Sequence, residues 1–278
     1  MATVAELLRW GGRALEASET PRLDAELLLG ATLARDRAGL FRDGDREVPA
    51  AAAARYRALV AARAAGRPVA QILGVREFWS LAFEVDEHTL VPRPETELLV
   101  EIALAALPSD SAARVADLGT GSGAIAVAIA RERPQAMVIA VEASAPALVV
   151  AARNVAHHAA GRVHLVRADW LAPFGPGSFD LIVANPPYVA QDDPRLTTTA
   201  LRFEPRSALA AGADGLRDLD RLAYRCAEAL AGGGRVILEH GAAQGRAVRT
   251  LLVAAGFADV STARDLAGLE RASWGTRR

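Results

Sequence analysis

The chain has 278 residues, which is enough for one large domain or two ordinary ones with a sizeable buried core. Its hydrophobic content of 51% is ordinary for a soluble globular protein, and its formal net charge of -1 argues against a generally basic, phosphate-binding surface. The single cysteine, Cys226, excludes an internal disulfide and offers no metal-ligand spacing. No secretory signal or long uncharged apolar run is visible. We therefore expect a cytoplasmic protein with no metal site and no membrane segment.

The first part of the chain predicts a small helical domain, which we place at residues 1–73. Leucines between Leu7 and Leu28 recur at roughly helical spacing. A second helical pattern, rich in alanine, runs from Ala50 to Ala65, and the run Gly66-Arg67-Pro68 ends it. No strand pattern interrupts this region.

The next residues, 74–93, predict a β-hairpin that links two domains. Aromatic and aliphatic residues recur between Gly74 and Pro94, and Asp86-Glu87-His88 lies between the two halves. The run Pro92-Arg93-Pro94 predicts an extended entry to a helix from about Glu95 to Leu107, because a residue before proline is disfavoured in the helical region.

Residues 94–278 alternate between strand and helix patterns, which predicts a doubly wound, mostly parallel sheet. The expected helices after the first are Ala124–Arg133, Ala145–His158 and Leu216–Ala231. The expected strands are Val115–Leu118, Val138–Glu142, Val163–Val166, Leu181–Ala184, Val236–Glu239, Ala258–Ala263 and Leu269–Trp274. Only a loop separates the last two strands, so we expect them to pair antiparallel at the sheet edge.

A glycine-rich loop follows the first of these strands and opens a helix. Glycines allow a sharp backbone turn and a close approach to a ligand. The pattern indicates a nucleotide-like cofactor more than a tight structural turn, although such a loop alone is a weak signal. The candidate cofactor-binding residues of this loop are Gly119, Thr120, Gly121, Ser122 and Gly123.

The ends of the next two strands carry three further residues, Glu142, Asp169 and Trp170, that strengthen the interpretation of a cofactor site. Glu142 ends the second strand, where an acidic side chain can accept hydrogen bonds from both ribose hydroxyls of a nucleoside. Asp169 could accept from an exocyclic adenine amine, and Trp170 could cover the adenine ring. A solvated Glu142 and a Trp170 that belongs to the core are the alternatives.

The fourth strand ends directly in the run Asn185-Pro186-Pro187-Tyr188. Ligands bind at the carboxyl ends of parallel strands, so this run faces the same crevice as the glycine loop. The prolines remove two backbone donors and stiffen the turn. They leave the Asn185 side-chain oxygen and the Pro186 carbonyl as acceptors, with Tyr188 as an aromatic wall.

That acceptor-rich corner suits a planar amide or amine nitrogen. Two acceptors can orient its N–H bonds in line with a methyl donor and stabilise the positive charge that develops. The sulfonium of S-adenosylmethionine supplies the difficult chemistry, so no strong base is needed before transfer. The predicted catalytic residues are Asn185, Pro186 and Tyr188; the substrate-binding set adds Pro187, and Asn185 also belongs to the cofactor site.

These motifs resemble the amino-methyltransferases that carry an (Asn/Asp)-Pro-Pro-(Tyr/Phe/Trp) run, and within them the PrmC/HemK family of peptide chain release factor glutamine N5-methyltransferases. The resemblance covers nearly the whole chain. The Pro92–Glu97 run discriminates best, because DNA methyltransferases of this class generally lack it. The other supporting stretches are Pro68–Gly74, Asp117–Ile125, Asn185–Tyr188, Phe203–Leu209, Leu238–Gly241 and Gln244-Gly245.

The resemblance implies a Rossmann-like class I methyltransferase domain at residues 94–278 and an N-terminal domain that helps recognise class I release factors. The implied substrate is the glutamine amide of the Gly-Gly-Gln motif. The glycine loop would then bind the methionine part of S-adenosylmethionine, with Glu142 at its ribose where the family usually has Asp. Asn185 and Pro186 would hold the glutamine amide.

Three other functions stay open from the sequence. A related family methylates a glutamine of a large-subunit ribosomal protein, and another class methylates DNA or RNA bases; a third interpretation is a cofactor-binding scaffold. The near-neutral charge and the lack of a basic recognition domain argue against direct, sequence-specific nucleic-acid binding. The segment that contains Glu204-Pro205 is expected to cover the pocket.

Overall fold

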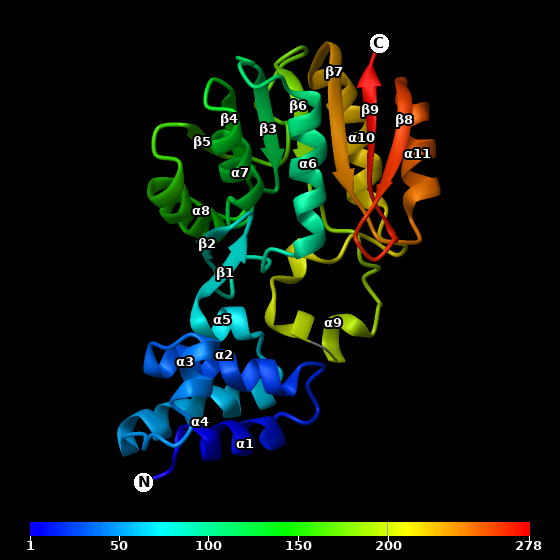
Figure 1. Ribbon diagram of the computed structural model, residues 1–278. Coiled ribbons are helices and arrows are strands. Elements are labelled where there is room, and N and C mark those ends of the chain that lie inside the picture. The colour runs from blue at the N-terminus through cyan, green and yellow to red at the C-terminus, as the bar shows by residue number, and fades with distance from the viewer. Residues whose placement is uncertain (199) are drawn as a thin grey trace. The chain divides into compact units, whose positions relative to one another are not determined.

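The computed structural model describes residues 1–198 and 200–278 and divides into two compact units, Met1–Val75 and Arg76–Arg278 (Figure 1). The helices of the first unit are α1 (Val4–Ala14), α2 (Pro21–Leu33), α3 (Arg37–Arg42), α4 (Ala50–Ala64) and α5 (Val69–Leu73).

The first unit has its own apolar core. Thr3 and Glu6 form a reciprocal capping box that begins α1, which satisfies backbone N–H groups that the helix leaves unpaired. Leu7, Leu28 and Tyr56 are fully buried between α1, α2 and α4. The expected N-terminal helical region is confirmed.

The hairpin is present, but its turn is not where the sequence pattern placed it. Strands β1 (Val75–Phe78) and β2 (Leu81–Glu84) are joined by Trp79 and Ser80, which have φ values of 52° and 57°. Two positive φ values match a primed hairpin turn, for which Trp-Ser is an unusual sequence. Asp86–His88 therefore follows the hairpin rather than dividing it, and the expected turn position was wrong.

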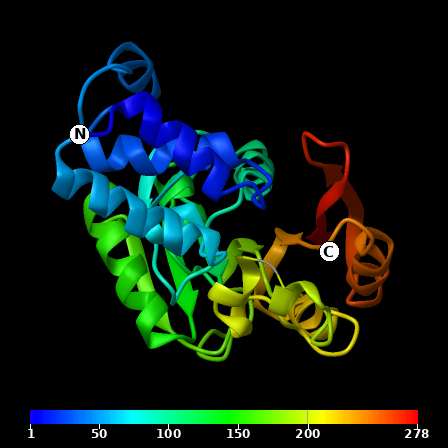
Figure 2. The same ribbon diagram turned by 90° about the horizontal axis from the view of Figure 1, so that it is seen from below.

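The second unit is built on a seven-stranded sheet with the order β5-β4-β3-β6-β7-β9-β8 in the described residues. Strands β3, β4, β5, β6 and β7 are parallel, and β9 is antiparallel to both of its neighbours, β7 and β8. The β8–β9 hairpin forms one edge of the unit (Figure 2). The strands are β3 (Arg114–Leu118), β4 (Met137–Glu142), β5 (Val163–Arg167), β6 (Phe179–Ala184), β7 (Leu230–Glu239), β8 (Phe257–Arg264) and β9 (Glu270–Arg277). The doubly wound fold with an antiparallel end is confirmed.

Helices cover both faces of this sheet (Figure 1). Successive strand residues point to opposite faces, so Val115 packs with α6 and α7, whereas Ala116 packs in the core that contains α10 and α11 residues. The helices are α6 (Glu97–Ala106), α7 (Ala124–Glu132), α8 (Ala145–His158), α10 (Arg217–Ala229) and α11 (Gly245–Ala254). Helix α10 ends two residues before its expected limit, because β7 begins at Leu230.

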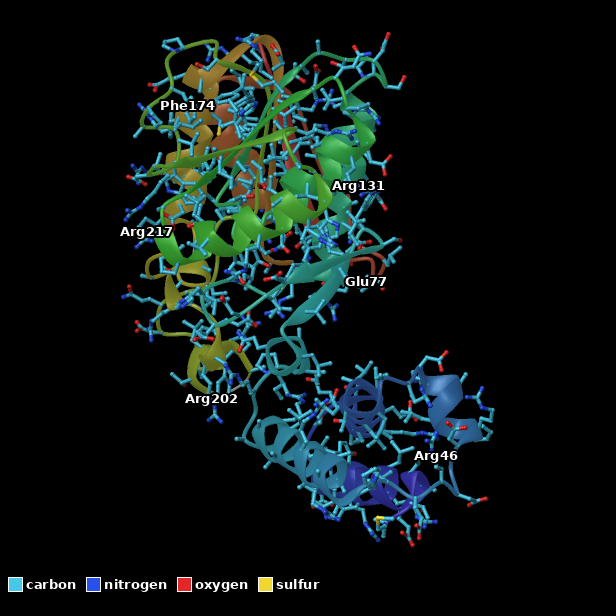
Figure 3. The ribbon with its side chains drawn as sticks, turned by 90° about the vertical axis from the view of Figure 1, so that its left-hand side faces the viewer. Arg46, Glu77, Arg131, Phe174, Arg202 and Arg217 are labelled. Carbon is cyan, nitrogen blue, oxygen red and sulfur yellow. The ribbon has the colours of Figure 1, made fainter. Side chains whose placement is uncertain are left out.

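Phe174 and Arg217 lie near opposite ends of the sheet (Figure 3). Phe174 packs on Phe179 at the amino end of β6, with ring centroids 4.9 Å apart, whereas Arg217 begins α10 near the carboxyl ends (Figure 3). No helix in the described ranges is long and apolar enough to cross a membrane. The same residues contain no cluster of histidine, cysteine or carboxylate side chains suited to a metal ion.

Candidate active site

A cavity of about 600 Å³ opens where the parallel strands end. The loops that follow neighbouring parallel strands converge at one edge of the sheet, and ligands of doubly wound folds bind there. Every residue that lines the cavity belongs to the second unit. The lining includes Gly119–Ser122 after β3, Glu142–Ser144 after β4, Ala168–Trp170 after β5, Asn185 and Pro187 after β6, and Arg217, Asp218 and Arg221 of α10.

The glycine loop turns sharply beside the cavity. Gly119 has φ 70°, and a Cβ atom placed there would lie 3.1 Å from the Trp170 ring. The N–H groups of Gly119 and Thr120 both donate to the Val141 carbonyl, at 2.8 and 3.0 Å. Gly119 through Ser122 line the cavity, whereas Gly123 caps α7 and is not part of the lining.

Glu142 binds the glycine loop directly. Its carboxylate accepts the Gly121 N–H at 3.0 Å and the Ser144 N–H at 2.9 Å. The carboxylate therefore fixes the loop after β3 to the loop after β4. Each oxygen accepts one of these two hydrogen bonds, and a carboxylate oxygen has room for a second donor.

Asp169 and Trp170 lie together at the wall formed after β5. The Asp169 carboxylate forms a two-point ion pair with Arg221 of α10, with N–O distances of 3.1 and 2.7 Å. Trp170 adopts φ 50°, a left-handed conformation that is uncommon for a large side chain, and its ring lies on Gly119. The arrangement joins an aromatic face to a carboxylate edge in one part of the cavity.

Asp117 lies beneath the loop and is fully buried. Its Oδ2 accepts the Thr120 hydroxyl at 2.5 Å and the Ala126 N–H at 3.0 Å, while Oδ1 has no hydrogen-bond partner among the described residues. Burial raises the pKa of this carboxyl to about 6, against the opposing effect of the two hydrogen bonds. The sequence pattern indicated no role for this residue beyond its place in the motif.

The Asn-Pro-Pro-Tyr run leaves β6 at the cavity edge. Asn185 lines the cavity and donates its Nδ2 hydrogen to Thr96 Oγ1 at 3.2 Å. Pro187 also lines the cavity, whereas Pro186 and Tyr188 are not among the lining residues. The Tyr188 hydroxyl instead donates to Glu239 Oε1 at 3.0 Å.

Glu239 is a part of this site for which the sequence pattern indicated no role. The side chain is 1% exposed at the end of β7, and it accepts the Thr96 hydroxyl at 2.7 Å as well as the Tyr188 hydroxyl. Burial raises the pKa of Glu239 to about 7, although both hydrogen bonds lower it. The strand register explains why Glu239 belongs to the site. Ala184 pairs with Leu238, so the residues that follow each of them, Asn185 and Glu239, are neighbours.

The long segment between β6 and α10 forms another wall. It contains the short helices α9 (Arg195–Thr198), η2 (Ala200–Phe203) and η3 (Arg206–Ala208). Pro205, Ser207 and Ala208 line the cavity, which supports the expectation that this segment covers the pocket. Glu204 binds the opposite wall, where it accepts the Val91 N–H at 3.2 Å and a short hydrogen bond from Arg93.

Comparison with known proteins agrees with a methyltransferase class for this fold and site. The Methyltransferase small domain model matches residues 95–212, and the PrmC N-terminal domain model matches residues 6–74. A crystal structure of a methyltransferase from Pyrococcus furiosus has a TM-score of 0.54 at 18% identity and covers 79% of this chain and 96% of its own, which supports the fold.

Whole-length relatives narrow the class to one family. The release factor glutamine methyltransferase of Burkholderia pseudomallei is 50% identical over 280 residues, covering 99% of this chain and 96% of the relative. The Escherichia coli protein of that name is 43% identical over 261 residues, covering 94% of each chain. The chain belongs to the release factor glutamine methyltransferase family.

Proposed function

We propose that this protein transfers the methyl group of S-adenosylmethionine to the side-chain amide nitrogen of the glutamine in the Gly-Gly-Gln motif of class I release factors. The observation that carries this proposal is the placement of Asn185. Its amide nitrogen is bound to Thr96, and no group in the described chain donates to its Oδ1. That oxygen is an acceptor at the edge of the same cavity that the glycine loop lines.

The residues of the cavity fit S-adenosylmethionine. A volume of about 600 Å³ lies within the usual range of about 300–1,000 Å³ for cofactor sites. Gly119 must lack a side chain because a Cβ would crowd the Trp170 ring. Thr89 also lines the cavity, and its buried hydroxyl has no hydrogen-bond partner in the described chain, which fits a site that holds a ligand.

In this proposal each part of the cofactor has its own contacts. Of the glycine loop Gly119–Gly123, the lining residues Gly119 through Ser122 would bind the methionine part. Glu142 would accept from the ribose hydroxyls with the lone pairs that Gly121 and Ser144 leave free. Trp170 would cover the adenine, and Asp169 would accept from its amine while remaining paired with Arg221.

When bound, the cofactor supplies an electrophilic methyl group on its sulfonium. The protein then orients the nucleophile. Asn185 Oδ1 and the Pro186 carbonyl accept the two amide N–H bonds, while Pro187 forms an apolar wall beside them. This grip aligns the amide nitrogen and stabilises the positive charge that grows as the new bond forms. No base is required beforehand, because the nitrogen loses its proton readily only after it has been methylated.

The two units have separate roles in this proposal. Residues 1–73 contribute to release factor recognition, residues 74–93 link the domains, and residues 94–278 carry the chemistry. The net charge of -1 favours a protein substrate over direct nucleic-acid binding. We place the reaction in the cytoplasm, where release factors act on ribosomes.

The test is methyl incorporation from labelled S-adenosylmethionine into purified substrates. Release factor with Gly-Gly-Gln should accept one methyl group, and the Gly-Gly-Ala variant none. DNA and a large-subunit ribosomal protein serve as competing substrates. Equal labelling of the Gly-Gly-Gln and Gly-Gly-Ala factors would falsify the glutamine assignment. Preferential labelling of DNA or of the ribosomal protein would identify that competitor as the substrate instead.

A further inference from the structure

Four side chains form one hydrogen-bonded chain that starts in the cavity lining, at Asn185 and Thr96, and ends behind it, at Glu239 and Tyr188. Asn185 Nδ2 donates to Thr96 Oγ1 at 3.2 Å, and the Thr96 hydroxyl donates to Glu239 Oε2 at 2.7 Å. The other oxygen of Glu239 accepts the Tyr188 hydroxyl at 3.0 Å. Glu239 thereby connects both ends of the Asn185–Tyr188 run.

The direction of these bonds follows from the number of hydrogens available. A threonine hydroxyl has one hydrogen, and an ionised carboxylate only accepts, so with Glu239 ionised the Thr96 hydrogen is committed to it. Oγ1 of Thr96 can then only accept from Asn185. The nitrogen and oxygen ends of a carboxamide are nearly identical in shape, so hydrogen-bond partners decide which end points where.

We propose that Thr96 and Glu239 are positioning residues that orient the Asn185 carboxamide with its oxygen toward the substrate nitrogen. This inference rests on the proposed function for its catalytic consequence. With the carboxamide reversed, the NH₂ group of Asn185 would face the N–H bonds of the substrate, donor against donor. The network therefore selects the productive orientation before substrate binds.

Burial supports this role for the network. Thr96 is 4% exposed and Glu239 is 1% exposed, so water does not compete for their hydrogen bonds. Thr96 ends the short helix η1 (Pro94–Thr96), whose proline-rich entry is fixed, and Glu239 ends a sheet strand. Both partners are held by rigid backbone, which makes the direction of the Asn185 amide a property of the fold.

The amide orientation can be tested without any substrate. Asparagine occurs at only two positions, Asn154 and Asn185, so selective ¹⁵N-asparagine labelling yields two side-chain NH₂ pairs. Asn154 is an internal control, because α8 buries it and its amide bonds to Ser122 and Glu84 carbonyls. We expect Thr96→Val and Glu239→Gln to shift the Asn185 pair and leave the Asn154 pair in place. Thr96→Ser, which keeps the hydroxyl, should restore the Asn185 shift.

Kinetics test the catalytic consequence. Thr96→Val should lower kcat by roughly 10- to 100-fold, because misplacement of an orienting group costs rates of this order. The Kd for S-adenosylmethionine and the KM for release factor should change less than twofold. Thr96→Ser should recover most of kcat. The matched control is Thr262→Val, which removes a part-buried hydroxyl bonded to Ser273 and Arg249 at the far edge of the sheet and should leave kcat unchanged.

A double-variant comparison separates positioning from general loosening of the structure. If Thr96 acts through Asn185, then Asn185→Ala and Asn185→Ala with Thr96→Val should have the same residual rate. The proposal would be overturned if the loss of rate in the double variant equalled the product of the two single losses. It would also be overturned if Thr96→Val left the NMR shifts of the Asn185 NH₂ pair unchanged. If Glu239→Gln does not fold, the two Thr96 variants decide the question by themselves. Failure to methylate any release factor would end the proposed function but not the amide result, which needs no substrate.

Discussion

Glu204 and Arg93 form an ion pair beside the cavity, although 111 residues separate them in the sequence. The Glu204 carboxylate is completely buried, and it also accepts the Val91 N–H. The pair ties the segment after β6 to the segment that precedes α6, and both segments line the cavity. The cover over the pocket is therefore fixed at one point by a charge that water cannot reach.

Removing the Glu204 carboxylate should loosen both walls. Glu204→Ala leaves Arg93 without its partner, and we expect the free energy of unfolding to fall by about 1–3 kcal/mol in urea denaturation. Cofactor affinity measured by calorimetry should fall as well. Asp193→Ala, in the same segment, is the control: its partner Arg195 is 69% exposed, so loss of the pair should have little effect on stability. Equal losses in both variants would contradict the clamp.

Asn185→Ala should abolish methyl transfer while S-adenosylmethionine still binds. An oriented acceptor that acts on developing charge contributes about 3 kcal/mol or more to transition-state stabilisation, which is a loss of at least about 100-fold in kcat. Single-turnover methylation of release factor measures the rate, and calorimetry measures binding. Near-normal turnover would remove Asn185 from the reaction.

The sequence predicted the sheet and most helices well, because their patterns are local. Helix α8 has the bounds that its periodicity indicated. The hairpin turn was misplaced because Trp79-Ser80 lacks the glycine or asparagine that usually marks two positive φ values. The sequence pattern placed the second half of the hairpin at the hydrophobic residues near Leu90, where the structure has no strand.

The sequence predicted only those residues of the candidate site that belong to a local motif. The glycine loop and Asn185 line one cavity, as expected from strand ends. The Thr96–Glu239 bond joins residues 143 positions apart, and the register of β6 against β7 brings Asn185 next to the same Glu239. Tyr188 was expected as a wall of the site, whereas its hydroxyl bonds to Glu239 behind the wall. A sequence motif shows which side-chain groups are present, but it does not show which of them are hydrogen-bonded to each other.

Glu142→Ala should weaken cofactor binding at least tenfold. The variant removes the proposed ribose acceptor and also releases the Gly121 and Ser144 N–H groups that position two loops. Loss of a charged hydrogen-bond acceptor costs about 1.5–3 kcal/mol, which corresponds to this change in affinity. Glu142→Asp should have a smaller effect, since it keeps the charge. Unchanged affinity of the alanine variant in calorimetry would exclude the ribose contact.

Asp117→Asn should stabilise the cofactor-free protein at neutral pH. The folded pKa of Asp117 is raised from 3.8 to about 6, so its contribution to stability is fully present below pH 3.8 and is lost as pH rises through about 6. Asparagine can accept the Thr120 and Ala126 hydrogen bonds without a buried charge. The variant should gain about 2–3 kcal/mol at pH 7.5 in urea denaturation and nothing near pH 3.5, because a pKa difference of one between the folded and unfolded states corresponds to about 1.4 kcal/mol.

Asp180→Asn provides a control of opposite sign for the Asp117 prediction. Hydrogen bonds from Arg114 lower the pKa of Asp180, so this carboxylate contributes stability above its unfolded pKa and loses it as pH falls through the folded one. Its substitution should therefore reduce stability at pH 7.5, where Asp117→Asn increases it. Parallel pH profiles for the two variants would mean that the amide substitution itself, rather than the buried charge of Asp117, sets the result.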